Sequence, residues 1–112
     1  MSSIRALWLT LAFAACSDSS GPGNGPSQSA NVAMTASETF SPSSVTIVRT
    51  GTVTWTNGAG IAHNVTFGLT AGSPANVPDF TTGSASRTFP TAGTFPYQCT
   101  IHPGMTGQVS VE

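Results

Sequence analysis

The sequence has very little charge and contains no lysine. Of its 112 residues, 3 are Lys or Arg and 4 are Asp or Glu, so 6% of the chain is charged, whereas an average soluble domain is about 25% charged. All three basic residues are arginines. Nucleic-acid binding needs a basic surface that neutralises phosphates, and this chain cannot form one. We therefore expect no nucleic-acid partner.

The chain also lacks an apolar run long enough to cross a bilayer. The longest, ALWLTLAFAA, covers residues 6–15, whereas a membrane helix needs about 20 residues. It follows a five-residue head with one arginine and ends just before Cys16. A short basic head, an apolar stretch and small residues are typical of a secretory signal. We expect residues 1–15 to be a signal peptide and the protein to be exported, in a bacterium to the periplasm.

Cys16 is a candidate for lipid attachment. Residues 13–16, FAAC, resemble a bacterial lipoprotein box, in which the cysteine becomes the lipidated first residue after cleavage. The alternative is an ordinary secretion signal that happens to contain a cysteine. Residues 17–30 include five Ser, three Gly and two Pro, a composition typical of a flexible linker. We therefore expect residues 16–30 to be a linker, which would suit a membrane-anchored lipoprotein facing the periplasm or the exterior.

The remaining residues, 31–112, contain few strong helix formers. Leucine occurs there only at Leu69, whereas Thr and Val are abundant, and β-branched residues fit pleated sheets. Seven stretches show side chains alternating between two faces, and turns rich in Gly, Pro, Asn and Ser separate them. This pattern predicts one all-β domain, a Greek-key β-sandwich or barrel of seven or eight strands. The expected inward-facing residues are Val32, Met34, Val45, Ile47, Val53, Trp55, His63, Val65, Phe67, Arg87, Phe89, Phe95, Tyr97, Cys99, Val109 and Val111.

Two parts of the domain fit this pattern less well. Residues 68–82 show weak alternation, which predicts either a long loop or an irregular edge strand. Pro96 lies within the strand that leads to Cys99. Because proline has no amide hydrogen to donate, this position should face a sheet edge or a bulge.

Few residues of the domain could carry chemistry, and one heptapeptide contains most of them. The sequence has no nucleophile elbow, no glycine-rich phosphate loop and no closely spaced carboxylate pair, so we expect no enzyme. Residues 99–105 read CTIHPGM, which places Cys99, His102 and Met105 at every third position. A thiolate, an imidazole and a thioether are donors that copper prefers.

His63 can supply a fourth donor, because it alternates with Val65 and Phe67 on the inward face. Cys99, His102 and His63 can form a trigonal set, with Met105 as a weak axial ligand. Each residue also has a structural alternative. His63 could be a hydrogen-bonded core histidine, His102 an exposed loop residue and Met105 core filling. Cys99 could be a buried thiol or a disulfide partner of Cys16. Structural zinc fits less well, since methionine is a poor zinc ligand.

The combined pattern resembles the cupredoxins, the small blue-copper proteins that include plastocyanin, pseudoazurin and amicyanin. The residues that carry the resemblance are F-x-P at 40–42, V-x-W-x-N at 53–57, HN at 63–64 and Y-x-C-x-x-H-x-x-M-x-G-x-V at 97–109. The spacing of the three loop donors is most like that of amicyanin. The resemblance covers nearly the whole of residues 31–112.

The resemblance implies one mononuclear type 1 copper ion. Its ligands would be His63, Cys99, His102 and, in the axial position, Met105. Asn64 would tie the upstream ligand loop to Thr100, next to Cys99. The resemblance further implies an uncharged apolar rim around His102 through which electrons pass, made of Ile61, Ala62, Pro103 and Gly104.

The implied function is that of a monomeric electron carrier. It would pass single electrons between redox proteins outside the cytoplasm, such as a c-type cytochrome and a copper oxidase or reductase. The alternative is a copper-delivery protein that supplies an oxidase. A single thiolate and a single loop methionine, rather than a methionine-rich tract, favour the carrier. Because the chain has so few charges, we expect little electrostatic steering and docking through the apolar rim.

Overall fold

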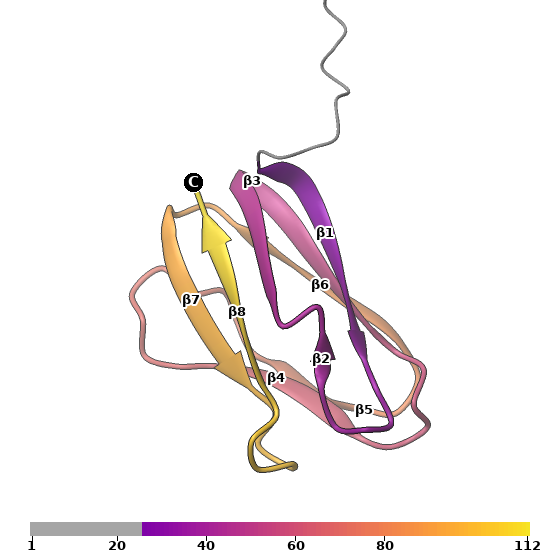
Figure 1. The fold of residues 1–112 in the computed structure, drawn as a ribbon. Helices are drawn as coiled ribbons and strands as arrows, with labels where there is room; N and C mark the ends of the chain where they lie inside the picture. Colours follow the sequence, from indigo (N-terminus) through magenta and orange to yellow (C-terminus); the bar gives the residue numbers. More distant parts are fainter. Residues whose placement is uncertain (1–25) are drawn as a thin grey trace, which may run out of the picture.

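The computed structural model describes residues 26–112; the predicted signal peptide, Cys16 and most of the predicted linker lie outside the described residues. The described part consists of strands and loops (Figure 1), which confirms the all-β prediction. It contains no helix that could span a membrane. The strands are β1 (Ser27–Met34), β2 (Phe40–Ser41), β3 (Ser44–Asn57), β4 (His63–Phe67), β5 (Val77–Phe80), β6 (Gly83–Phe89), β7 (Gly93–Gln98) and β8 (Thr106–Val111).

The long strand β3 joins the two layers of the sandwich. Its first residues, Ser44–Ile47, pair in parallel with β8. Its later residues pair in parallel with β1 and antiparallel with β6. β8 continues through β7 and β4 to β5, so one layer contains β8, β7, β4 and β5 and the other contains β2, β1, β3 and β6 (Figure 1). Where β3 changes layer, a Cβ on Gly51 would lie 2.8 Å from the carbonyl oxygens of Gln28 and Val48.

The core lies between the layers, where the predicted alternation placed it. All the expected inward-facing residues are buried except Val45 and Arg87, which are half-buried. Aromatic rings pack edge to face at its centre, with centroid distances of 5.4 Å for Trp55–Tyr97 and 4.7 Å for Phe40–Tyr97. Such packing supplies both buried apolar area and favourable ring electrostatics. The Arg87 guanidinium instead donates hydrogen bonds to backbone carbonyls.

The first strand begins a few residues before the predicted start of the domain. Strand β1 begins at Ser27, so residues 27–30 belong to the sheet and not to the linker. Ser29 and Ala30 pair with Thr52 and Val53 of β3. The composition of this segment correctly indicates that its side chains are mostly exposed. Main-chain hydrogen bonding between strands does not require apolar side chains, so the composition cannot reveal it.

The two irregular parts have clear positions in the sheet. Residues 68–76 form a loop, and β5 follows it as the edge strand beside β4, so both alternatives for this stretch are partly correct. β4 pairs with β7 only at Tyr97 and Gln98. At Pro96, β7 therefore has β8 as its neighbour on one side only, which satisfies the requirement that proline lie where no amide hydrogen is needed.

Candidate metal centre

Three donor side chains from two distant parts of the sequence meet at one end of the sandwich. His63 begins β4, Cys99 directly follows β7, and His102 lies in the loop before β8. Cys99 Sγ is 3.5 Å from His102 Nδ1 and 4.0 Å from His63 Nδ1. The two Nδ1 atoms are 3.2 Å apart. One candidate ligand atom from each residue lies within 4.8 Å of the others, so a single ion can contact all three.

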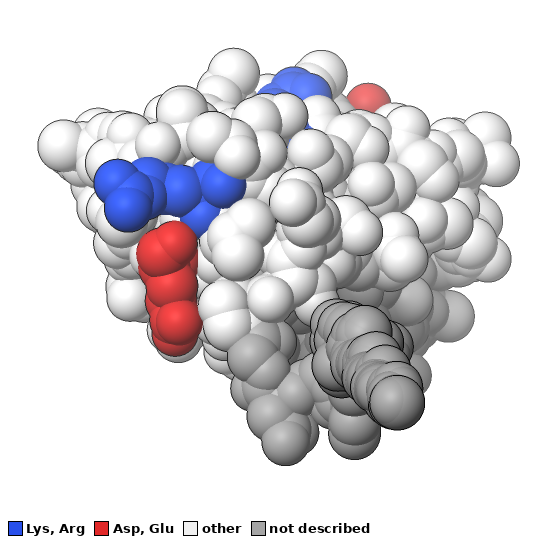
Figure 2. Space-filling view, turned by 90° about the horizontal axis from the view of Figure 1, so that it is seen from above, with Lys and Arg blue, Asp and Glu red and all other residues white. Residues whose placement is uncertain are grey.

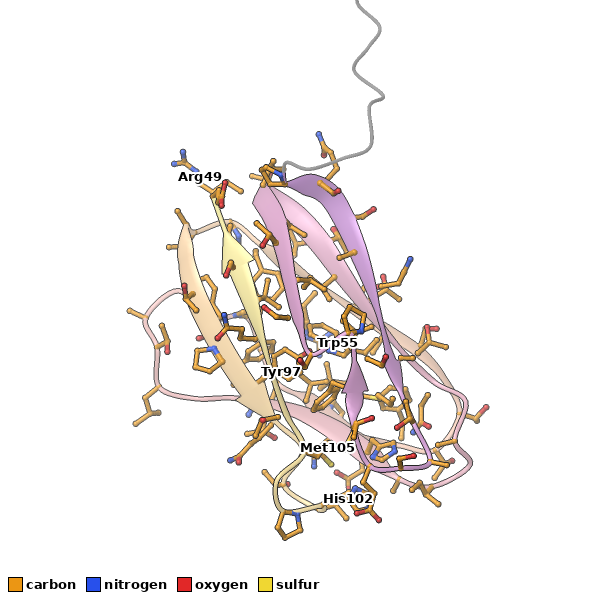
Figure 3. All side chains as sticks on the ribbon, in the orientation of Figure 1. Arg49, Trp55, Tyr97, His102 and Met105 are labelled. Carbon is orange, nitrogen blue, oxygen red and sulfur yellow. The ribbon has the colours of Figure 1, made fainter. Side chains whose placement is uncertain are left out.

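The loop that carries Cys99 and His102 turns back at Met105, and Figure 3 shows Met105 and His102 at the same end of the molecule. The amide of Cys99 donates to the carbonyl of Met105 at 3.0 Å, and the amide of Met105 donates to the carbonyl of His102 at 3.1 Å. Gly104 turns the chain with a φ of 86°, a conformation that favours glycine. The Met105 side chain is 1% exposed, so its thioether lies inside the molecule with the other donors.

A backbone carbonyl fixes the orientation of His63. Its Nε2 lies 3.2 Å from the Thr35 carbonyl oxygen, which can only accept, so the ring proton lies on Nε2. Nδ1 then has its lone pair free on the side of Cys99. Burial lowers the pKa of His63 below its ordinary value, although the hydrogen bond to Thr35 acts in the opposite direction. A neutral imidazole with a second hydrogen bond is the form that binds a metal.

The Asn64 side chain connects β4 to the residue after Cys99. Its Nδ2 donates to Thr100 Oγ1 at 2.8 Å and to Asp79 Oδ1 at 2.9 Å. Its Oδ1 accepts from the Thr100 amide at 3.1 Å and from Thr66 Oγ1 at 3.0 Å. All four hydrogen-bonding positions of this buried amide are therefore used, and the two segments that carry His63 and Cys99 are held together.

The residues that flank His63 and His102 in the chain are mostly uncharged, and one carboxylate lies near the His102 ring. Pro103 and Gly104 are exposed and Ala62 is half-buried, while Ile61 is 37% exposed. The structure adds two residues that the sequence analysis missed. Ile101 is 40% exposed, directly before His102. Glu38 Oε2 lies 3.9 Å from His102 Nε2, and its side chain is 53% exposed.

Sequence reasoning had no signal for Glu38 or for Asp79. Glu38 lies in the turn between β1 and β2, 64 positions before His102 in the chain. Asp79 lies on the short edge strand β5, in the stretch whose alternation is weakest. Only the pairing of β1 with β3 and of β5 with β4 brings these two carboxylates to the metal-binding end.

The donor set fits copper. Two imidazole nitrogens, a thiol and a buried thioether form a cluster with no carboxylate among them, and this combination of borderline and soft donors suits copper better than zinc, calcium or magnesium. Fold and donors together define a mononuclear copper-binding β-sandwich protein. Residues 27–112 match the family described as copper binding proteins of the plastocyanin/azurin family, and the chain belongs to this family, the cupredoxins.

Individual relatives agree with this assignment. A plastocyanin from Scenedesmus fuscus is 40% identical over 84 residues, 65% of this chain and 86% of the relative. An amicyanin from Paracoccus denitrificans is 44% identical over 64 residues, 54% of this chain and 49% of the relative. A solved purple cupredoxin from Nitrosopumilus maritimus superposes with a TM-score of 0.67 at 28% identity, covering 74% of this chain and 99% of that one. Copper is thus the cofactor, and His63, Cys99, His102 and Met105 are arranged as a type 1 copper site.

Proposed function

We propose that this protein is an electron carrier that holds one copper ion through His63, Cys99, His102 and Met105. It exchanges single electrons with redox proteins outside the cytoplasm and makes or breaks no bonds in a substrate. The observation that carries the proposal is the convergence of Cys99 Sγ and two histidine Nδ1 atoms, which lie 3.2 to 4.0 Å apart at one end of the sandwich. Membership of the plastocyanin/azurin family supports it.

Copper, when bound, supplies a one-electron change between Cu(I) and Cu(II). The role of the chain is to keep the donor atoms in one arrangement in both states. The Thr35 carbonyl holds His63, Asn64 holds the segment after Cys99, and the Cys99–Met105 backbone bond closes the loop. Because these contacts lie within a closed β-sandwich, little rearrangement accompanies the exchange.

His102 is the donor through which a partner can approach. Its side chain is 15% exposed, whereas His63, Cys99 and Met105 are each at most 2% exposed. An electron leaving the site through the His102 ring crosses the shortest path to the surface. The exposed Ile61, Ile101 and Pro103 side chains around it allow a close, water-poor contact.

An enzymatic role has less support. A Cu-containing nitrite reductase from Thermus scotoductus shares the fold, with a TM-score of 0.67 at 26% identity, but this chain covers 22% of that protein. Within residues 26–112, His63, Cys99 and His102 form the one cluster of His, Cys, Asp and Glu that could hold a metal.

Export and anchoring complete the proposal and rest on the sequence. Residues 1–15 would direct export, and lipid on Cys16 would keep a monomeric carrier at a membrane, near a c-type cytochrome or a copper oxidase or reductase. Metabolic labelling with a radioactive fatty acid tests the anchor. We expect label on the wild type and none on Cys16→Ser. If the wild type is not labelled, residues 1–15 would be an ordinary secretion signal and Cys16 would carry no lipid.

The carrier is tested by adding Cu(II) to the copper-free protein. We expect an intense absorption band at about 600 nm from thiolate-to-copper charge transfer. Cys99→Ser should abolish this band and leave the far-UV circular dichroism spectrum unchanged. Met105→Leu should shift the reduction potential. Met34→Leu is the matched control, because Met34 is also buried, at 2% exposure, but belongs to β1 and not to the ligand loop. A folded protein without the band would refute the proposal.

A second measurement separates the carrier from a copper-delivery protein. The copper-loaded protein is mixed with an apo-oxidase and, separately, with a reduced c-type cytochrome. We expect rapid bleaching of the blue band by the cytochrome and retention of copper against the apo-oxidase, because three of the four donors are buried. Transfer of the metal as fast as the electron would overturn the carrier assignment.

A further inference from the structure

Asn57, the last residue of β3, is a buried polar side chain that the proposed copper site leaves without a role. It is 2% exposed and completes the V-x-W-x-N motif at 53–57. After it, the chain leaves one layer of the sandwich, passes through residues 58–62 and enters the other layer at His63. Asn57 therefore directly precedes the segment that leads to the first copper ligand.

The Asn57 side chain makes three hydrogen bonds to backbone groups. Its Oδ1 accepts from the Ala59 amide at 3.0 Å. Its Nδ2 donates to the carbonyl of Ile61 at 2.9 Å and to the carbonyl of Phe80 at 2.7 Å. A side-chain amide has two hydrogens to donate, and both are used here. One residue thus joins the loop at 58–62 to strand β5.

Both carbonyls that accept from Asn57 belong to segments next to His63. Ile61 precedes His63 by two residues in the chain. Phe80 is the partner of His63 in the antiparallel register of β4 with β5. Because Nδ2 bonds to both carbonyls, it holds the segment before His63 and the strand beside His63 in one arrangement.

The acceptor of the His63 ring proton is tied to the same place in the sheet. Asn57 pairs with Met34 in the parallel register of β1 with β3. Thr35 follows Met34, and its carbonyl oxygen lies 3.2 Å from His63 Nε2. The backbone of His63 and the hydrogen-bond acceptor of its ring are therefore both placed relative to Asn57.

The two donated bonds require an amide at position 57. A side chain that accepts from the backbone amide two residues later forms a turn, and aspartate or serine can accept in the same way. Of these three residue types, only asparagine also brings two hydrogens to the carbonyls of Ile61 and Phe80. An ionised aspartate would place a negative oxygen against those carbonyl oxygens. The residue type at position 57 therefore matches the path to His63 and not only the turn.

Ion pairs do not take this role in the described part of the chain. Figure 2, seen from the end where β1 starts, shows few charged side chains on a surface that is otherwise uncharged. Within residues 26–112, the one contact at ion-pair distance joins Glu38 to His102 and includes neither residues 58–62 nor β5. The segment before His63 is held by a neutral amide, whose hydrogen bonds added salt does not screen as it screens ion pairs.

We propose that Asn57 is a positioning residue of the copper centre, whose side-chain amide fixes the backbone of His63 and keeps His63 Nδ1 directed toward Cys99. This inference rests on the copper site of the carrier proposed above, in which His63 Nδ1 lies 4.0 Å from Cys99 Sγ. Without the two donated bonds, residues 58–62 and β5 can shift apart, and the His63 ring can leave the Thr35 carbonyl. The ring proton is then no longer confined to Nε2, and the site loses a preorganised donor.

Two variants of Asn57 remove the donated bonds. Asn57→Asp keeps the size of the side chain and the acceptor for the Ala59 amide, but when ionised it donates no hydrogen. Asn57→Ser can donate one hydrogen bond at most, so it serves as the second variant if the aspartate prevents folding. Near-UV circular dichroism of the copper-free proteins establishes that each variant is folded.

The first measurement needs no copper. The ¹³C chemical shift of His63 Cδ2, recorded at about pH 8 where an imidazole is neutral, reports which ring nitrogen carries the proton. We expect the Nε2–H form alone in the wild type and a mixture of both forms in the Asn57 variants. Both forms in the wild type, or rapid solvent exchange of its Asn57 Nδ2 hydrogens, would overturn the inference without any variant.

Copper affinity is the second measurement. Competition with a chelator of known affinity gives the dissociation constant for Cu(II). Loss of a group that orients a ligand weakens metal binding by about 10- to 100-fold, so we expect the dissociation constant to rise by about tenfold or more in Asn57→Ser. A wild type that binds no copper would refute the carrier function, whereas the ring measurement on the copper-free protein would still test Asn57.

Asn76→Ala is the matched control. Its Oδ1 accepts from the Phe67 amide at 2.8 Å, so it also bonds the backbone of β4, but at the end of the strand away from His63. Asn76→Ala should lower the free energy of unfolding in a urea titration and leave the His63 ring and the copper affinity unchanged. If the folded Asn57 variants likewise lose stability alone, or if Asn76→Ala changes the His63 ring as much as they do, Asn57 is not a positioning residue.

Discussion

At the metal centre, individual hydrogen bonds determine which atom of each side chain faces the other donors. The Thr35 carbonyl leaves His63 Nδ1 for the metal. Asp79 accepts from Asn64 Nδ2 and thereby directs Asn64 Oδ1 toward the Thr100 amide. The orientation of the donor side chains therefore depends on residues that are not ligands.

Replacing Asn64 tests this dependence. Asn64→Ala removes four hydrogen bonds and leaves the Thr100 amide without its acceptor. We expect the free energy of unfolding of the copper-free protein to fall by about 2 kcal/mol, and the reduction potential of the loaded protein to shift.

Urea titration and voltammetry measure the two effects. Asn31→Ala is the control, because Asn31 is exposed on β1 and its loss should cost less than about 0.5 kcal/mol. If Asn64→Ala left the free energy of unfolding and the reduction potential unchanged, the ligand loops would keep their conformation without the Asn64 hydrogen bonds.

The sequence predicted the donors and part of their surroundings. Cys99, His102 and Met105 are close in the chain, and His63 belongs to an alternating strand, so local patterns are enough to find them. The resemblance to cupredoxins supplied Asn64 and Thr100. Glu38 and Asp79 reach the site only through strand pairing, and no local pattern encodes that.

At the level of elements, the pairing of β7 with β8 explains why residue 107 is a glycine. Gly107 lies opposite Tyr97 in register. A Cβ on Gly107 would lie 2.5 Å from Tyr97 Oη and 2.6 Å from Cζ, far inside contact distance. The strand that follows the ligand loop thus needs a glycine at this position because the tyrosine ring occupies the space.

Gly107→Ala should therefore destabilise the fold by about 1–3 kcal/mol through overpacking. Gly58→Ala is the matched control, since no atom lies within 4 Å of a Cβ there. Thermal unfolding of the copper-free variants measures the difference. Adding Tyr97→Phe to Gly107→Ala removes the closest atom and should recover part of the loss; no recovery would indicate that the ring carbons, with Cζ at 2.6 Å, are the obstacle.

Alternation predicted the core strands because one face of each is buried. It predicted less where backbone pairing alone forms the strand, as at Ser27–Ala30 of β1, whose side chains are mostly exposed. The short edge strand β5 is a similar case: Val77 is its one buried residue. Burial produces a sequence pattern, whereas main-chain hydrogen bonding does not.

Considered as a whole, the chain has few groups that titrate at high pH. It contains one tyrosine, two cysteines and no lysine, and arginine stays protonated. Burial raises the pKa of Tyr97 above its ordinary value of about 10. Between the unfolded and folded pKa values, the unfolded chain has lost the phenol proton and the native protein has kept it, so stability falls as pH rises.

We therefore expect the contribution of the Tyr97 phenol to the free energy of unfolding to be constant below about pH 10 and to decrease above it. Urea titrations from pH 8 to about 11.5 measure the slope, and Tyr97→Phe should remove the part due to the phenol. If the variant and the wild type lose stability in parallel, the phenol is already ionised at its ordinary pKa in the native state.

The positions of the chain ends have a practical consequence for electrochemistry. The start of β1 and the C-terminus lie together at the end opposite the loop that carries His102 (Figures 1 and 3). A protein immobilised on an electrode through a tag after Glu112 would present its copper face to the solution, and current would have to cross the length of the sandwich. Adsorption on an apolar monolayer through Ile61 and Ile101 would give the reverse orientation and the faster interfacial exchange.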